Sequence, residues 1–137
     1  MFLQLAYGNI FVVTLGQGGH VMNYVYASRM GKTEKLIQKL AIHAMKIENG
    51  TEKAEGDFIL FTYTDGNGIV PKAVESFLEL NGGRLKGVIA GGSKERHAAT
   101  FGWAGDVIAE KYHVPCLYKV DGEGSEEDVV NIKKVIR

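Results

Sequence analysis

A short loop of hydroxyl, glycine and basic residues is the part of this sequence best suited to chemistry. It follows the apolar run Tyr24–Ala27 and opens an amphipathic segment that begins near Lys32. The residues of this first loop are Ser28, Arg29, Met30, Gly31, Lys32 and Thr33. A loop between a strand and a helix points backbone N–H groups and the positive end of the helix at an anion, and the hydroxyls of Ser28 and Thr33 add donors. We therefore predict that the first loop binds a phosphate group.

Two further loops, each following an apolar run, favour a flat ligand beside that phosphate. The candidate contacts of the second loop are Thr62, Tyr63, Thr64, Asp65, Gly66, Asn67 and Gly68. Those of the third loop, residues 91–99, are Gly91, Gly92, Ser93 and His97. Tyr63 offers an aromatic wall, while Gly66 and Gly68 allow the backbone to shift at little cost. A flavin needs such a wall beside its phosphate, and it carries the redox chemistry that the protein tunes.

Several better-known motifs are incomplete. A nucleotide-binding P-loop ending at Thr33 would need glycine where Tyr26 stands, and a dinucleotide fingerprint starting at Gly16 would need glycine where Val21 stands. Ser93 lacks the second glycine of a nucleophile elbow. The histidines show no metal-ligand spacing, and Cys116 lies in an apolar run, where we expect an inert thiol. We therefore predict neither a metal site nor a catalytic side chain.

From residue 22 onward, apolar runs alternate with amphipathic segments, which predicts strands alternating with helices. The expected strands are Asn23–Ser28, Ala44–Glu48, Asp57–Thr62, Leu85–Gly91 and Val114–Val120. Helices are expected over Lys32–His43, from Pro71 to a stop at 81–83, over Phe101–Tyr112, and from a capping box at Ser125–Asp128 toward the C-terminus.

This alternation predicts an α/β fold with a parallel sheet covered on both faces. Five strands with a phosphate loop after the first indicate a flavodoxin-like three-layer sandwich with strand order 2-1-3-4-5. The connection between the second and third strands, Asn49–Gly56, is short. Eight extended residues span roughly 28 Å, enough to cross the first strand but too little for a full helix. We therefore expect a trimmed helix at this connection.

The composition limits the function classes. The chain has 137 residues, of which 45% are hydrophobic, and its formal net charge is +0. A neutral protein lacks the field that attracts nucleic acid or an anionic membrane, and no apolar run approaches the ~20 residues of a membrane helix. One cysteine fits a reducing compartment, so we expect a cytoplasmic protein.

The first 21 residues stand apart from this pattern. Residues 2–14 are apolar but lack the basic start of a signal peptide, and the glycine-rich stretch 16–19 separates them from Met22. We interpret residues 1–21 either as an appendage produced by a misplaced translation start or as a genuine additional strand or hairpin. Residues 22–137 form the predicted binding domain in both interpretations.

From Met22 to its end, the chain resembles the NrdI family of small flavodoxin-like proteins. The first loop carries part of the resemblance. The later matching segments are Thr62–Pro71, Leu85–Ala90, Ala104–Ala109, Val114–Pro115 and Gly124–Val129. Single motifs among them are weak, whereas their order along the chain is specific.

The resemblance implies FMN as cofactor and a role as activator of class Ib ribonucleotide reductase. Reduced NrdI is understood to convert oxygen to superoxide, which the small, radical-bearing subunit uses to assemble its dimanganese-tyrosyl radical cofactor. A flavin or thiol reductase would supply electrons. This implies a redox partner rather than a stand-alone enzyme, with its partner docked on the rim of the second and third loops. A neutral protein also disfavours a reduced, anionic flavin less than an acidic carrier does, which favours complete reduction.

The chain departs from the family in two loops. NrdI proteins usually show Ser-Gly-Asn-Arg-Asn-aromatic-Gly-Asp in the third loop; here Gly92 matches and Lys94 keeps the positive charge, but the asparagines and the aromatic are absent. His97 is the candidate replacement as a stacking surface. The first loop is more basic than in many relatives, so either Arg29 or Lys32 is a candidate partner of the phosphate.

Two alternative functions remain. A generic flavodoxin that carries electrons between reductases would have the same fold, but such carriers are usually strongly acidic. A response-regulator-like signalling domain would need an acid pair near the end of the first strand, where Ser28 and Arg29 stand.

Overall fold

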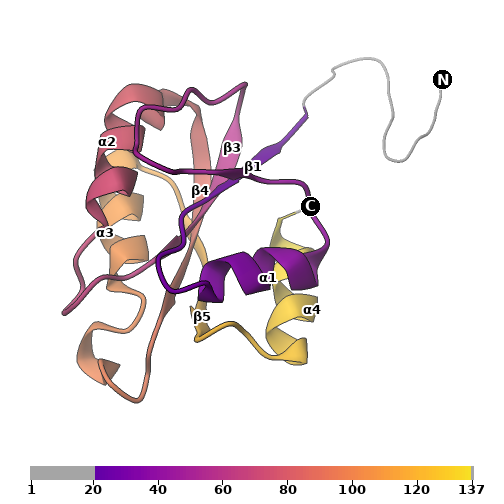
Figure 1. The fold of residues 1–137 in the computed structure, drawn as a ribbon, viewed down its shortest axis with the longest axis vertical. Helices are drawn as coiled ribbons and strands as arrows, with labels where there is room; N and C mark the ends of the chain where they lie inside the picture. The colour runs from indigo at the N-terminus through magenta and orange to yellow at the C-terminus, as the bar shows by residue number, and fades with distance from the viewer. Residues whose placement is uncertain (1–20, 137) are drawn as a thin grey trace, which may run out of the picture.

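In the computed structural model, five parallel strands form one sheet in the order β2-β1-β3-β4-β5. Figure 1 shows this sheet with the helices packed around it. The structure describes residues 21–136, so the two interpretations of the N-terminal extension concern residues that lie, except for Val21, outside it. The strands are β1 Asn23–Tyr26, β2 Met45–Lys46, β3 Phe58–Tyr63, β4 Leu85–Gly92 and β5 Cys116–Asp121. The helices are α1 Lys32–Leu40, α2 Lys72–Asn81, α3 Trp103–Tyr112 and α4 Glu126–Val135. The predicted flavodoxin-like order is confirmed.

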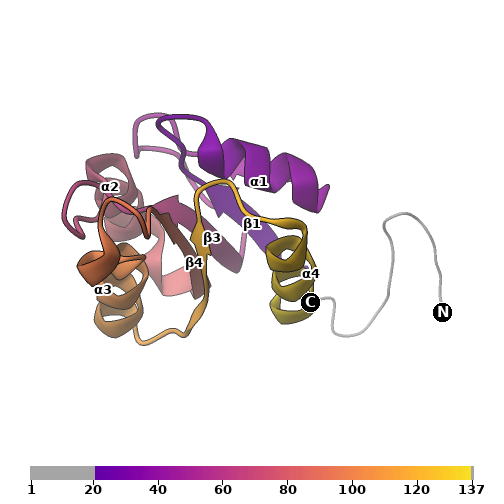
Figure 2. The same ribbon diagram turned by 90° about the horizontal axis from the view of Figure 1, so that it is seen from below.

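Two pairs of helices sandwich the sheet (Figure 2). On one face α2 and α3 cover a cluster that includes Phe58, Leu60 and Val88. On the other face α1 and α4 cover a cluster that includes Ile59 and Phe61. The central strand β3 is buried on both faces, which explains why its sequence is a continuous apolar run rather than an alternating one.

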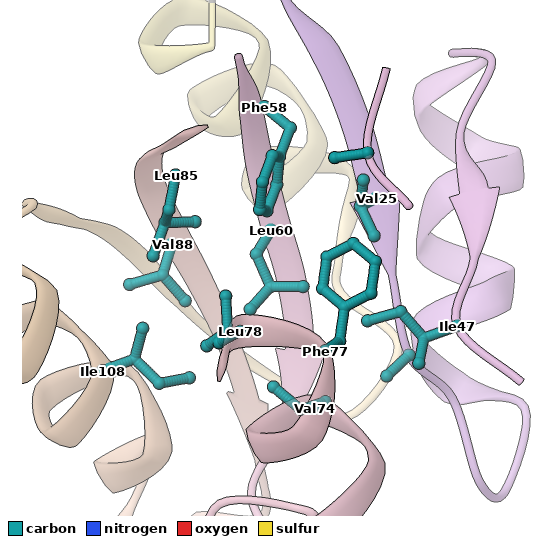
Figure 3. Close-up of a cluster of buried hydrophobic side chains, with 12 residues drawn as sticks. Val25, Ile47, Phe58, Leu60, Val74, Phe77, Leu78, Leu85, Val88 and Ile108 are labelled. Carbon is teal, nitrogen blue, oxygen red and sulfur yellow. The ribbon is translucent and has the colours of Figure 1, made fainter. Parts of the chain in front are cut away.

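Aromatic packing anchors the α2 face of the sheet (Figure 3). The rings of Phe58 on β3 and Phe77 on α2 meet edge to face, with centroids 5.6 Å apart and an interplanar angle of 75°. Both side chains are fully buried. Burying an aromatic side chain of this kind stabilises a fold by about 1.5–3 kcal/mol, which fixes α2 against the strands that end at the candidate site.

The connection between β2 and β3 contains no helix in residues 47–57, so the predicted trimming is complete. In place of the hydrogen bonds that a helix would make, the side chain of Asn81 on α2 bonds the backbone of this connection. Its amide accepts the N–H of Ala54 at 2.9 Å and donates to the carbonyl of Glu52 at 3.0 Å. The Glu52 carboxylate accepts the N–H groups of residues 48, 49 and 50. Hydrogen bonds within the connection and to Asn81 therefore hold this segment against α2.

Helix boundaries match the predictions to within a few residues. Helix α1 ends earlier than expected, because Ala41 adopts a left-handed conformation with φ of 55° and closes the last turn. Pro71 is the N-cap of α2 rather than its first helical residue. The predicted capping box is present: Ser125 Oγ accepts the N–H of Asp128 at 3.1 Å, and Asp128 accepts the N–H of Ser125 at 2.9 Å. None of the helices within residues 21–136 has the length and hydrophobicity to cross a bilayer.

Candidate functional site

A cleft opens at the carboxyl ends of β1, β3, β4 and β5, the edge where open parallel sheets bind ligands. It is a concave, partly open site of the kind in which small molecules bind. Its walls are formed by Ser28, Arg29, Met30, Lys32, Thr33, Tyr63, Thr64, Gly66, Gly91, Gly92, Ser93, Arg96, His97 and Gly122. The three predicted loops therefore share one cleft.

The first loop presents hydrogen-bond donors at one end of the cleft. Ser28 Oγ accepts the N–H of Gly31 at 3.2 Å and, more weakly, that of Glu34 at 3.4 Å, which leaves its own hydroxyl hydrogen for a ligand. Thr33 is only 7% exposed, yet it lines the cleft. The N–H groups of the first turn of α1 have no partner within the helix. This donor set suits a phosphate.

Gly31 gives the first loop its shape. Its φ is +89°, a left-handed conformation that side chains other than glycine rarely adopt, and it is the N-cap of α1. The backbone can therefore turn sharply from β1 into the helix. A β-carbon at this position would meet nothing within 4 Å, so the requirement for glycine comes from the backbone angle and not from crowding.

Arg29 reaches from the first loop to the second. Its guanidinium donates to Asp65 Oδ1 at 3.0 Å and lies 5.6 Å from the centroid of the Tyr63 ring. Burial raises the pKa of the Tyr63 phenol, and the negative charge of Asp65 raises it further, although Arg29 acts in the opposite direction. The phenol therefore stays protonated at neutral pH, and Tyr63 presents an uncharged aromatic surface to the cleft.

The second loop is a tight turn held from two sides. Asp65 and Ile69 exchange two backbone hydrogen bonds of 2.8 Å, which close the turn. The N–H of Ala104 at the start of α3 donates to Thr64 Oγ1 at 3.4 Å. Gly68 lies against the ring of Trp103. The loop is thus fixed within itself and against α3.

The third loop is tied to the end of β5. The N–H of Lys94 donates to Asp121 Oδ1 at 3.1 Å, and the N–H of Gly122 donates to the carbonyl of Gly92 at 2.9 Å. Ser93 organises the loop internally, since its Oγ accepts the N–H of Arg96 at 3.2 Å and its carbonyl accepts that of His97 at 2.9 Å. These bonds hold the wall that faces the second loop.

The cleft is electropositive. Its walls include the side chains of Arg29, Lys32 and Arg96, and within residues 21–136 they include no aspartate or glutamate. Of these three cations, Arg29 forms an ion pair, with the carboxylate of Asp65. Such a cleft favours an anionic ligand, and it favours a ligand that becomes more negative when it is reduced.

Most of the predicted site residues line the cleft, and the others hold the loops in place. Five of them do not line the cleft: Gly31, Thr62, Asp65, Asn67 and Gly68. Thr62 is buried and donates its hydroxyl to the carbonyl of Tyr63, while Asp65 and Gly68 make the supporting contacts described above. The remaining predicted residues of the three loops are wall residues. No group of metal-ligating side chains occurs in residues 21–136.

Two wall residues were missed in the sequence. Arg96 lies in the third loop, and its positive charge beside a predicted anion site is the signal that could have identified it. Gly122 follows β5, whose carboxyl end reaches the same edge of the sheet as the other loops. Cys116 was expected in the core but is only half-buried at the start of β5; burial raises the pKa of its thiol, which keeps it protonated.

The sequence is similar to those of proteins named NrdI. A family model described as NrdI Flavodoxin like matches residues 24–134. A protein named Protein NrdI from Ruegeria sp. (strain TM1040) is 39% identical over 116 residues, which cover 79% of this chain and 82% of the relative. Another Protein NrdI, from Rhizobium leguminosarum bv. trifolii (strain WSM2304), is 41% identical over 117 residues, which cover 79% of this chain and 87% of the relative.

Solved flavodoxins have the same fold. A flavodoxin of Streptococcus pneumonia TIGR4 superposes with a TM-score of 0.63 at 23% identity, covering 83% of this chain and 93% of its own. Flavodoxin 1 from Bacillus cereus superposes with a TM-score of 0.60 at 19% identity, covering 85% of this chain and 99% of its own. At this level of identity the likeness shows the fold alone.

Proposed function

Since the chain belongs to the NrdI flavodoxin-like family, we propose that it is a flavoprotein that binds FMN in the cleft and activates class Ib ribonucleotide reductase. The observation that carries the proposal is the pairing of a phosphate-type donor set with an uncharged aromatic wall in one cleft. Ser28, Thr33 and the first turn of α1 form the donor set, and Tyr63 forms the wall. FMN joins a phosphate to a flat ring and needs both.

The residues present fit this cofactor. The backbone of the first loop and the hydroxyls of Ser28 and Thr33 would hold the phosphate. Tyr63 and the glycine-rich stretches at 66 and 91–92 would flank the ring, and His97 would stand at the divergent third loop. When bound, FMN would supply one-electron redox chemistry toward oxygen, with superoxide as the proposed product.

The side chains of the cleft contribute binding and electrostatics rather than proton transfer. Arg29, Lys32 and Arg96 place positive charge around the site without any carboxylate on its described walls. Positive charge favours the gain of electrons by a bound group, because the reduced form is more negative. The cleft therefore favours full reduction of its ligand, which is the state that reacts with oxygen.

The proposed partner is the small subunit of class Ib ribonucleotide reductase, and the proposed electron donor is a flavin or thiol reductase. The oxidant would pass to the dimanganese site of the small subunit, so the protein acts as a cytoplasmic redox partner rather than as a stand-alone enzyme. The rim of the second and third loops is the proposed docking surface. Exposed apolar side chains lie beside the second loop: Ile69, which follows it in the chain, is 62% exposed, and Trp103 of α3, which packs on Gly68, is 46% exposed.

A second candidate is a generic electron-carrying flavodoxin, which the fold likeness to solved flavodoxins favours. The electropositive cleft argues against it. A carrier that works between one-electron partners must make the second reduction harder than the first, and negative charge around the flavin does this. Here the described walls carry the opposite charge.

The test starts with purified protein titrated with FMN, in which we expect tight, saturable binding. The loaded protein is then reduced without oxygen and divided: one portion is exposed to oxygen with a superoxide trap, and the other is mixed with the manganese-loaded small subunit before oxygen is admitted. We expect superoxide and an active tyrosyl radical. Protein that fails to bind added FMN would refute the proposal, and protein that binds FMN but never activates the subunit would favour the electron carrier.

A further inference from the structure

We propose that the two basic residues of the first loop have separate tasks: Lys32 pairs with the flavin phosphate, whereas Arg29 is a positioning residue that fixes the second loop through Asp65. The inference rests on the proposed function and assigns the phosphate cation within it. The sequence left either residue as the candidate, and the side-chain contacts distinguish them.

The side chain of Arg29 is already bound to residues of the second loop. Its guanidinium pairs with Asp65 at 3.0 Å and lies over the Tyr63 ring at 5.6 Å from the centroid. Both contacts cross from the first loop to the wall on which a ring would stack. The ion pair joins residues 36 positions apart in the chain, so it links the first loop directly to the second.

Asp65 is the residue through which such a link can act. Its backbone closes the second-loop turn, because its N–H donates to the carbonyl of Ile69 and its carbonyl accepts the N–H groups of Gly68 and Ile69. A side chain that holds Asp65 therefore holds the whole turn, including Gly66 on the cleft wall. The ion pair itself is exposed and individually weak, so we expect a modest but specific effect.

Lys32 has the opposite character. It is the first residue of α1, lines the cleft, and makes no ion pair with any residue of the described chain. A cation in the first turn of a helix is repelled by the positive end of the helix dipole. The lysines that do form ion pairs in the described chain are not cleft-wall residues; for example, Lys46 pairs with Glu34 at 3.2 Å. An anion bound at this helix end would compensate both the helix and Lys32.

The first experiment measures the dissociation constants of FMN and riboflavin, which differ by the phosphate. Lys32→Met should raise the constant for FMN about tenfold and that for riboflavin less than about twofold. Arg29→Met and Asp65→Asn should raise both constants equally, by about threefold to fivefold. The double variant should be no worse than either single one. Lys86→Met, at an exposed position near the start of β4, is the matched control and should change neither constant.

The second experiment needs no flavin. Trp103 is the single tryptophan of the chain and packs on Gly68, so acrylamide quenching of its fluorescence reports the order of the second loop. Arg29→Met and Asp65→Asn should each raise the quenching constant, and their combination should raise it no further. Lys32→Met should leave it unchanged, and so should Lys86→Met.

The outcomes separate the inference from the proposed function. If Arg29→Met weakens FMN but spares riboflavin, Arg29 is the phosphate cation and the inference is overturned. Multiplying effects of Arg29→Met and Asp65→Asn would overturn the link between the loops. If the wild-type protein binds neither flavin, the proposed function fails together with the role of Lys32. The quenching experiment then still tests the role of Arg29: a raised quenching constant in Arg29→Met supports it, and an unchanged constant refutes it.

Discussion

Trp103 packs directly against Gly68, and the fit leaves no room for a side chain. A β-carbon on Gly68 would lie 2.5 Å from Cε3 of the indole ring, and the glycine has a φ of +98°. Trp103 is the first residue of α3, whereas Gly68 belongs to the second loop. The helix therefore supports from outside the turn whose inner side forms a wall of the cleft.

Gly68→Ala should consequently disturb the second loop twice, through the backbone angle and through the indole. We expect a loss of about 1–3 kcal/mol in the free energy of unfolding and a red shift of the Trp103 fluorescence as the ring is displaced into water. Gly66→Ala is the matched control. Gly66 also has a positive φ, of +44°, but its β-carbon would meet only the end of Ile69 at 4.0 Å, so only the backbone cost should remain. Equal emission spectra of the two variants would contradict the packing argument.

Asn81 should be the most sensitive polar residue of the scaffold, because it replaces the hydrogen bonding of the absent helix between β2 and β3. The side chain is 6% exposed and bonds Ala54, Glu52 and Phe77. Asn81→Ala leaves the N–H of Ala54 and the carbonyl of Glu52 without that partner, so we expect a loss of about 3 kcal/mol in urea unfolding.

The control for this variant is Asn131→Ala on α4. Asn131 makes one long hydrogen bond of 3.4 Å, donated to the Tyr118 hydroxyl, and is only partly buried. Its replacement should change the free energy of unfolding by less than about 0.5 kcal/mol. A loss at Asn81 no larger than at Asn131 would show that water can replace the amide.

Glu52 should make stability depend on pH in the acid range. Burial opposes ionisation of its carboxyl, but hydrogen bonds from the backbone of residues 48, 49 and 50 outweigh burial and lower the pKa. A pKa that is lower in the folded state gives a stabilisation that is complete above the ordinary glutamate value of about 4.3 and is lost as the pH falls through the folded value.

Glu52→Gln should therefore cost about 1 kcal/mol at pH 7, and the difference from the wild type should shrink as the pH falls through the folded pKa of Glu52. Urea unfolding at a series of pH values measures this. The exposed Glu55 lies in the same connection, and Glu55→Gln provides a comparison that should follow the wild type at every pH. A difference that grows on acidification would mean that the sign of the shift is wrong.

The sequence predicted the fold well because the fold depends on periodicity and chain length. The continuous apolar run of β3 identified a strand buried on both faces, and a connection too short for a helix, Asn49–Gly56, was consistent with β2 at the edge. The loops of the site were found for a related reason: each follows a strand, and parallel strands deliver their carboxyl ends to one edge.

What the sequence could not predict are contacts between loops. Nothing local indicates that Arg29 faces Asp65, because the partners are 36 positions apart and both side chains are typical of exposed loops. The same holds for Gly68 against Trp103. Gly122 joined the cleft only because β5 is paired with β4, which brings its end beside Gly92. Such contacts depend on the register of the sheet.

The positive charge at Arg96 should tune the reduction of the proposed flavin. Arg96 lines the cleft in the third loop. Removing a cation makes a nearby group harder to reduce, so Arg96→Gln should make the midpoint potential of the loaded protein more negative by about 20 mV, which corresponds to about 1 kcal/mol for two electrons. Arg84→Gln removes the same charge at the start of β4, a full strand of eight residues from the cleft, and should shift the potential by less than about 5 mV. Both potentials are measured by anaerobic equilibration with a reference dye. Equal shifts in the two variants would indicate that the net charge of the protein, rather than the cation on the cleft wall, sets the potential.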